Sequence, residues 1–232
     1  MIKFTDNFQK NVIPLIEEFS KKYGKNHVHK YFFEILTKTK ELYQLNCKKD
    51  KGQSWRNESG AMLENLVVYF IQEEIKKLGY DLITDDQIKK ASQDDEIISK
   101  VYRNIVIRYG DYSILPDGDI IIYNPIDGKV SVIISCKNSL RERYAQTLYW
   151  KLKLSMDPIT KPIKMYFITI DKESNKKPEL DINKRNGRPT KSRILLEHEM
   201  DCVYVGRELQ DVSDKVKEFD EFIGDLKKII KV

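Results

Sequence analysis

The chain has 232 residues, of which 41% are hydrophobic and 33% charged, with 10 Gly and 7 Pro, a composition that excludes fibrous and low-complexity chains. Its 41 basic and 36 acidic residues give a net charge of +5, which is compatible with a polyanionic partner without requiring one. The three cysteines are widely spaced and the N-terminus has no apolar signal segment. We therefore expect one cytoplasmic α/β domain over residues 1–232, with a reducing environment and no membrane span.

The first 50 residues predict a helical region that serves packing. Apolar residues recur at helical spacing from Phe8 to Phe19, Gly24 is placed to end that helix, and the pattern repeats over residues 28–43. We interpret residues 1–50 as an N-terminal packing or dimerisation region of the domain.

The histidines of this region are expected to be solvated. His27 and His29 are two residues apart, so on a helix they point to different sides and do not form a pair of ligands. The chain has no Cys-x2-Cys pair, and histidines and cysteines alone do not predict a zinc site.

A polar stretch and a long helix come next. Residues 47–59 predict a basic loop, either a solvated connection or a contact to phosphates. Residues 60–78 then predict a strong amphipathic helix, with Glu64 beside its apolar stripe. An acid in that position usually lies at the solvent boundary, so Glu64 needs a further argument before it is given a role.

The next segment leads into the sheet. Thr84 to Gln87 is a capping box that opens a helix predicted to reach about Val101. Residues 104–109 then predict a strand, and Gly110 and the next residue a turn towards the central hairpin.

The central hairpin carries the strongest chemical pattern. Residues 120–123 and 130–134 are rich in β-branched side chains and are separated by turn formers. Strand alternation places Asp117 and Asp119 on one face, and Ser135 and Lys137 together on the second strand. Paired in a hairpin, two carboxylates and one amine meet at its open end. Such a group can hold a divalent cation and orient a water for phosphodiester cleavage.

A helix that can read DNA bases follows the hairpin. It is predicted to begin near Asn138, with Asn138 or the next serine as its cap. Arg141 and Arg143 can donate to guanine O6 and N7, and Glu142 can accept from cytosine N4. The structural alternative is a surface helix with an ion-pair pattern.

The remaining elements complete a mixed sheet flanked by helices. Residues 163–170 and 200–205 predict strands, and residues 212–230 predict an amphipathic helix. The basic stretch 181–193 is either a solvated loop or a DNA contact, with Arg185 and Arg188 as the candidate DNA-binding residues.

Two motifs within residues 115–154 carry a family resemblance. The order Pro-Asp at residues 116–117, a spacer, and Ser135-Cys136-Lys137 resembles the PD-(D/E)XK nuclease superfamily. Serine replaces the usual acid, as in the CCGG- and CCNGG-reading type II restriction endonucleases of the NgoMIV and BsaWI kind. The segment from Lys137 to Arg143 is similar to the K-x3-R-(D/E)-R base-reading motif of that branch.

The resemblance implies a restriction-endonuclease-like α/β fold with a mixed central sheet, and a site for Mg2+. Lys137 and Ser135 would belong to the catalytic group, and Asp119 and Asp117 would be catalytic and metal-binding, with either as the principal ligand. The branch recruits its missing acid from a helix. Glu64 is our first choice, and Glu73 or Glu74 on the same helix are alternatives.

The resemblance also implies the substrate. Arg141, Glu142 and Arg143 would read a CC:GG element in a short palindrome of double-stranded DNA. Cleavage of both strands of a palindrome would require a two-fold symmetric homodimer, with residues 212–230 or the first two helices as the interface. Two other functions remain open. One is a non-catalytic DNA-binding module in which Ser135 marks a decayed site, and the other is a repair nuclease without sequence preference.

Overall fold

The computed structural model describes residues 2–46, 51–91, 95–138, 143–171, 182 and 187–230, without the side chains of residues 43–46 and 51–57. The helices in chain order are η1 (Phe8–Val12), α1 (Ile13–Tyr23), η2 (Lys25–Tyr31), α2 (Phe32–Asn46), α3 (Lys51–Lys77), α4 (Asp85–Lys90), α5 (Glu96–Ile105), α6 (Arg143–Met156), α7 (Lys191–Glu199), η3 (Phe219–Glu221) and α8 (Phe222–Ile230). The strands are β1 (Asp81–Thr84), β2 (Ile107–Tyr109), β3 (Tyr112–Ile114), β4 (Ile120–Tyr123), β5 (Val130–Lys137), β6 (Lys164–Thr169), β7 (Cys202–Val205) and β8 (Val216–Glu218).

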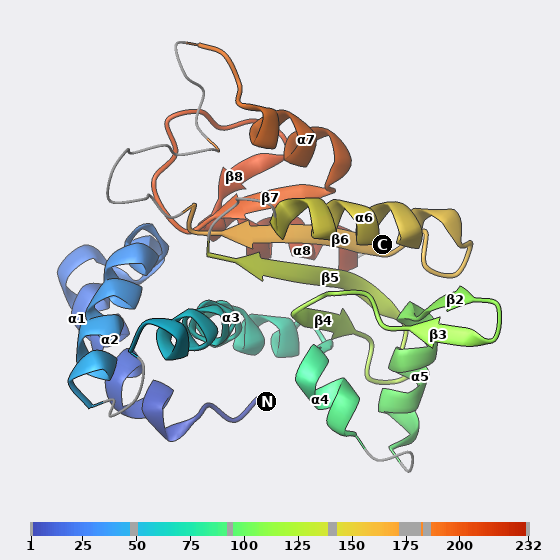
Figure 1. Ribbon diagram of the computed structural model, residues 1–232, viewed down its shortest axis with the longest axis horizontal. Helices are drawn as coiled ribbons and strands as arrows, with labels where there is room; N and C mark the ends of the chain where they lie inside the picture. Colours follow the sequence, from blue (N-terminus) through green and yellow to red (C-terminus); the bar gives the residue numbers. More distant parts are fainter. Residues whose placement is uncertain are drawn as a thin grey trace.

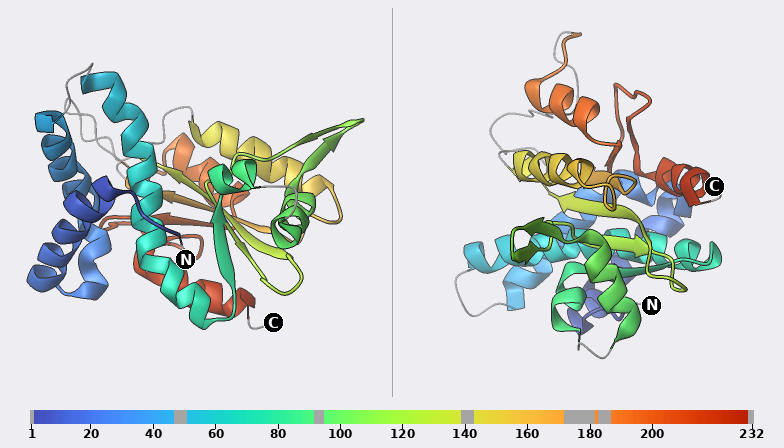
Figure 2. Two further views of the ribbon diagram at one scale, coloured as in Figure 1. Left: turned by 90° about the horizontal axis from the view of Figure 1, so that it is seen from below. Right: turned by 90° about the vertical axis from the view of Figure 1, so that its right-hand side faces the viewer.

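Six of these strands form one mixed sheet in the order β1-β4-β5-β6-β7-β8 (Figure 1). Strands β1, β4 and β5 pair antiparallel, whereas β5 to β8 pair parallel. The tight turn between β4 and β5 permits only antiparallel pairing, while the longer crossovers through α6 and α7 return the chain parallel. Strands β2 and β3 form a separate ribbon that projects from the domain (Figure 2).

Helices cover both faces of the sheet (Figure 2). One core packs α1, α2, α3 and α8 against one face, and it includes Ile122 and Ile134. The other core packs α4 to α7 against the opposite face, and it includes Ile121 and Ile133. Because both faces of the sheet are buried, β4 is a continuous apolar run, and six of the eight residues of β5 are buried, among them Ser135.

The predicted N-terminal helices are confirmed, but their apolar faces are used within the chain. Phe8, Ile16 and Phe19 lie in the first core together with Phe222 and Leu226 of α8. These side chains are therefore covered in the monomer, and the apolar faces proposed for dimerisation are not free surfaces.

The structure corrects two helix predictions in the first half of the chain. Helix α3 begins at Lys51, so the second part of the predicted loop 47–59 is helical; Cys47 to Asp50 lie outside the described residues. Contacts beyond α3 hold its first half: Asn7 donates to Glu58 at 3.3 Å, and Asn138 donates to the Ser59 carbonyl at 2.6 Å.

The helix predicted from the Thr84 capping box is two helices. The capping box itself is confirmed, with the Gln87 N–H donating to Thr84 Oγ1. Helix α4 ends at Lys90, and Asp95 caps the start of α5 by accepting from the Ile98 N–H at 3.1 Å. Helix α5 extends to Ile105, so the following strand β2 is shorter than predicted.

Two C-terminal predictions were wrong in part. Residues 212–230 contain strand β8 and the short helix α8 instead of one long helix. The stretch 181–193 runs into α7, whose Arg193 is 1% exposed and donates to the carbonyls of Ile182 and Asp211. Arg193 is therefore a structural residue and is not available to DNA. No helix in the described part of the chain is long and apolar enough to cross a membrane.

Candidate active site

The β4–β5 hairpin positions the candidate catalytic residues. Asp119 directly precedes β4, Lys137 is the last residue of β5, and Ile120 pairs with Ile134. The Asp119 N–H donates to the Ile134 carbonyl at 2.8 Å, which extends the pairing to the open end of the hairpin.

The absence of a side chain at Gly118 lets the backbone before β4 pass close to Ile133 of β5. A Cβ atom at this position would lie 2.3 Å from Cγ2 of Ile133, well inside van der Waals contact. Glycine between the two aspartates therefore allows both to approach β5.

Lys137 and the two aspartates form the centre of the site. The Lys137 Nζ atom lies 3.2 and 3.4 Å from the Asp119 carboxylate oxygens and 3.7 Å from Asp117 Oδ2. Asp119 Oδ2 also accepts from the Cys136 N–H at 2.5 Å. The side chains of Lys137 and Asp119 are 12% and 14% exposed, whereas Asp117 is 31% exposed. The predicted meeting of two carboxylates and one amine is confirmed, and Asp119 is the more firmly held aspartate.

Burial and neighbouring charges control the ionisation of this group. Burial raises the pKa of Asp119, and the charge of Asp117 raises it further, although Lys137 and the Cys136 N–H oppose these effects. Burial by itself would lower the pKa of Lys137, but the charges of Asp119 and Asp117 outweigh it and raise that pKa. Lys137 is therefore held as an ammonium group between two acids.

Helix α3 adds Glu64 to the site. Burial raises the pKa of Glu64 to about 8, and the negative charge of Asp119 contributes to this increase while Lys137 opposes it. Glu64 is thus an acid electrostatically coupled to the hairpin group, and its recruitment to the metal site stays a prediction. The alternatives lie elsewhere, since Glu73 and Glu74 line a cavity with His29 and Glu74 pairs with Lys77 at 2.6 Å.

Ser135 does not join the acids. Its side chain is fully buried, and its hydroxyl lies 3.1 Å from Oγ1 of Thr147 on α6. The structure thus places Ser135 between the sheet and α6, where its contact fixes the helix against β5.

The sequence did not point to Asp85, which lies beside the site at the start of α4. The pairing of Thr84 with Ile120 places the next residue near the hairpin, and the Asp85 N–H donates to the Asp119 carbonyl at 3.4 Å. Asp85 and Asp86 also contribute to the raised pKa of Glu64. Recognition of strand β1 would have provided the register that brings Asp85 to this place.

The candidate DNA-binding residues are only partly described. Arg141, Glu142 and Arg185 lie outside the described residues. Arg143 is the first residue of α6 and is exposed, and Arg188 is also exposed.

The predicted cap for that helix has a different role. The side chain of Asn138 donates to the Ser59 carbonyl, so it holds the end of β5 against α3. This contact links the strand that carries Lys137 to the helix that carries Glu64.

The known proteins that are similar to this chain in sequence are all named as type II restriction enzymes. The family model described as "BsaWI restriction endonuclease type 2" matches residues 96–230. A Methanocaldococcus jannaschii protein, whose given name is that of a type II restriction enzyme, MjaVIP, is 34% identical to this chain over 223 residues. The match covers 95% of this chain and 94% of that protein. A Helicobacter pylori protein, also named as a type II restriction enzyme, HpyAORF263P, is 37% identical over 116 residues. This match covers 49% of this chain and 58% of that protein.

Two solved structures align with nearly the whole chain, and the first of them is similar to it in fold. The crystal structure of the specific restriction endonuclease AgeI–DNA complex has a TM-score of 0.58 and 17% identity, covering 96% of this chain and 91% of that chain. The restriction endonuclease PspGI–substrate DNA complex has a TM-score of 0.48 and 15% identity, covering 100% and 98%.

Proposed function

Because the chain belongs to the BsaWI family of type II restriction endonucleases, we propose that it uses Mg2+ to cleave double-stranded DNA at a short palindrome containing a CC:GG element. It is a type II site-specific deoxyribonuclease, and the predicted restriction-endonuclease-like fold is confirmed. The metal, the sequence element and the residue roles are the parts that we propose. The observation that carries them is the Lys137 amine held between Asp117 and Asp119 at the end of the hairpin.

The donor set fits a hard divalent cation. Mg2+ prefers carboxylate oxygens and is commonly held by one or two of them. In this proposal Asp119 and Asp117 would supply such oxygens from the hairpin, and Glu64, whose charge is coupled to that of Asp119, would supply another from α3. Burial is the main cause of the raised pKa values of Glu64 and Asp119, and neighbouring acids raise both further, namely Asp119 for Glu64 and Asp117 for Asp119. A bound cation would favour the ionised form of both acids. Bound there, Mg2+ would polarise the phosphate and lower the pKa of an attacking water.

The chain supplies positioning and charge around that centre. The Cys136 N–H fixes one oxygen of Asp119, so the carboxylate enters the reaction already oriented. Lys137 is positioned to hold the water or a phosphate oxygen through its ammonium group. Ser135 acts indirectly, since its contact with Thr147 sets the position of α6 beside the site.

One incubation separates this function from its alternatives. Purified protein is mixed with plasmid DNA and Mg2+, and the products are resolved on a gel. Discrete fragments support the proposal. Binding without cleavage would indicate a non-catalytic DNA-binding module, and a smear would indicate a nuclease without sequence preference.

Glu64→Gln is expected to lower the cleavage rate by about 100-fold, which corresponds to about 3 kcal/mol of transition-state stabilisation. The amide keeps the shape of the side chain but cannot provide an anionic ligand. The measurement is the single-turnover cleavage rate as a function of Mg2+ concentration. Glu73→Gln on the same helix is the matched control, because Glu73 is exposed and lines a different cavity. A Glu64 variant as active as the Glu73 variant would transfer the role to another acid, with Asp85 the nearest choice.

A homodimer accounts for cleavage at a palindrome, because the Arg141–Arg143 segment of one chain can read only a half-site. Sedimentation of the protein with a cognate duplex measures this directly. Two chains for each duplex are expected, and a monomer on the cognate duplex would contradict the two-fold arrangement.

Arg143→Ala is expected to cost about 1 to 3 kcal/mol of specific affinity and to relax the preference for G·C pairs, because the guanidinium can bond two acceptors of guanine. Arg188→Ala is the comparison, since a phosphate contact weakens binding to all sequences alike. Titrations use the cognate duplex and duplexes altered at one base pair. A uniform loss of affinity in Arg143→Ala would make Arg143 a phosphate anchor as well.

A further inference from the structure

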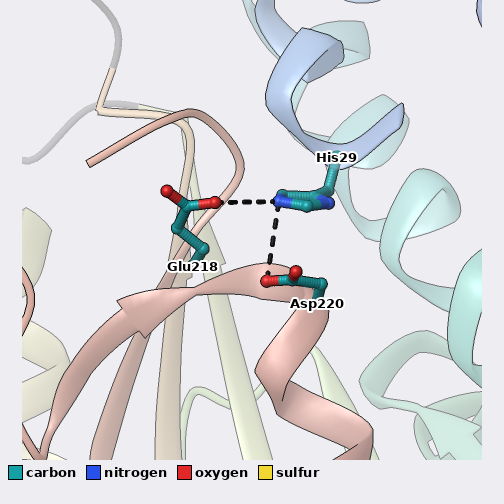
Figure 3. A group of neighbouring side chains, drawn as sticks. All are labelled: His29, Glu218 and Asp220. Carbon is teal, nitrogen blue, oxygen red and sulfur yellow. Dashed lines mark hydrogen bonds and ion pairs between the residues drawn. The ribbon is translucent and has the colours of Figure 1, made fainter. Parts of the chain in front are cut away.

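We propose that His29, Glu218 and Asp220 form a second metal site, separate from the nuclease centre, which binds a transition-metal ion such as Zn2+. Figure 3 shows the three side chains converging from η2, β8 and η3. One ligand atom from each lies within 4.8 Å of the other two. The expectation that no zinc site exists considered only histidines and cysteines, and here two carboxylates complete the set.

The surroundings of His29 favour a metal ligand. Its side chain is 4% exposed, and Nδ1 lies 3.1 Å from the Asn26 carbonyl. A carbonyl oxygen can only accept, so Nδ1 carries the hydrogen and Nε2 faces the two carboxylates. A histidine that binds metal commonly has this arrangement, in which the second ring nitrogen donates to a backbone carbonyl and fixes the ring.

The distances match the edges of a metal polyhedron. Nε2 lies 3.3 Å from Glu218 Oε2 and 3.6 Å from Asp220 Oδ1. A tetrahedral ion with ligands at about 2.0 to 2.1 Å sets neighbouring ligand atoms about 3.3 Å apart. A direct bond between an imidazolium and a carboxylate is shorter, about 2.7 to 2.9 Å. Without an ion, Nε2 makes a long hydrogen bond to Glu218 and a longer contact to Asp220, and both separations are also close to the edge length of a tetrahedral metal site.

The charge balance also favours a cation. Two carboxylates face Nε2 of His29, and the Lys30 Nζ atom, 3.2 Å from Glu218 Oε2, offsets one of the two negative charges. Lys30 lies 3.9 Å from Glu208 as well, so it has a second acid to pair with when an ion takes the Glu218 oxygen. Glu218 is further fixed by the Leu209 N–H, which donates to its other oxygen at 3.1 Å.

The site opens into a cavity that can supply the remaining ligand. His29 and Asp220 line a cavity of about 650 Å³ together with Gln72. The Gln72 Oε1 atom is buried and has no hydrogen-bond partner among the described residues. A metal-bound water in the cavity would provide a donor of the kind that this oxygen lacks.

A metal here would connect distant parts of the chain. His29 and Glu218 are 189 residues apart, and their elements join the N-terminal helical region to the β8 edge of the sheet. An ion that binds the folded but not the unfolded chain raises its thermal stability. At about 100 times its dissociation constant, the ion should raise Tm by about 5 to 10 °C.

The test uses the full chain, stripped of metal by chelation and then supplied with excess Mg2+ to occupy the nuclease carboxylates. Co2+ is added as a spectroscopic probe, and Zn2+ is then used to displace it. We expect about one Co2+ per chain with the intense visible absorption of tetrahedral coordination, displacement by Zn2+, and the rise in Tm with Zn2+. His29→Gln should weaken binding by about 100-fold.

His27→Gln is the matched control, because His27 is exposed and only two residues away. It should bind like the unaltered chain. Asp220→Asn provides a second variant in case His29→Gln fails to fold. Asp220 is 45% exposed, so water can solvate the asparagine amide that replaces its carboxylate. The proposal would be overturned if no Co2+ bound in addition to any at the nuclease site, or if the bound Co2+ gave an octahedral spectrum. Equal Co2+ affinity in the His27 and His29 variants, or normal binding by the Asp220 variant, would also overturn it.

Discussion

Lys137→Ala is expected to lower the DNA cleavage rate by at least about 100-fold, the range in which a positioned proton-transfer or phosphate-orienting group contributes. The amine lies 3.2 Å from Asp119 and 3.7 Å from Asp117, so its charge would act at the reacting centre that we propose. Affinity for the cognate duplex should remain within a few-fold, because the base contacts that we propose come from Arg141, Glu142 and Arg143 and not from Lys137. Single-turnover cleavage and equilibrium binding of the same variant separate these two effects.

Lys129→Ala is the matched control for this substitution. Lys129 lies at the opposite end of β5 from Lys137 and is exposed, so its loss removes one positive charge without touching the site. Cleavage by the two variants should therefore differ by about the full 100-fold. Near wild-type cleavage by Lys137→Ala would show that the catalytic group has been assigned to the wrong hairpin.

Asp119→Asn is expected to reduce cleavage by about 100-fold or more and to shift the Mg2+ requirement to higher concentration. Asp117→Asn should have a smaller effect. The reason is geometric: Asp119 is 14% exposed and fixed by the Cys136 N–H, whereas Asp117 is 31% exposed and lies farther from Lys137. Cleavage rates measured across a Mg2+ series distinguish a lost ligand, which excess metal partly restores, from a lost orientation, which it does not.

Asp111→Asn serves as the control for the aspartate variants. Asp111 is exposed in the turn between β2 and β3, outside the catalytic hairpin, so its substitution should leave the Mg2+ dependence unchanged. A larger loss in Asp117→Asn than in Asp119→Asn would reverse the order of the two ligands. Full activity in the double variant would exclude this aspartate pair from catalysis altogether.

Local sequence determined the catalytic hairpin. The β-branched runs, the turn between them and the two-residue periodicity fix which side chains lie at the open end, since all of this information is contained within 21 residues from Asp117 to Lys137. The capping box likewise predicts Thr84 as the N-cap of α4 without reference to the rest of the fold.

Short elements at the edges of the sheet depended on tertiary structure. Strand β1 has four residues, and its pairing with β4 brings Asp85 to the site, a consequence that no local pattern carries. In the C-terminal segment, Val216, Phe219, Phe222 and Leu226 fall at spacings that also suit a helix. Pairing with β7 instead draws the first of them into strand β8, because edge pairing and burial outweigh a weak local preference.

Long-range contacts decided the rest of both sites. The sequence could nominate Glu64 on the helix before the hairpin, but the packing of α3 against β5 is what couples it to Asp119. His29 was expected to be solvated because its spacing from His27 points the two side chains to different sides of a helix and so gives them no common ligand role. It is buried because β8 and η3 place Glu218 and Asp220 against it from the other end of the chain. Spacing within one segment predicts which side chains share a face, whereas only the folded chain determines which faces meet.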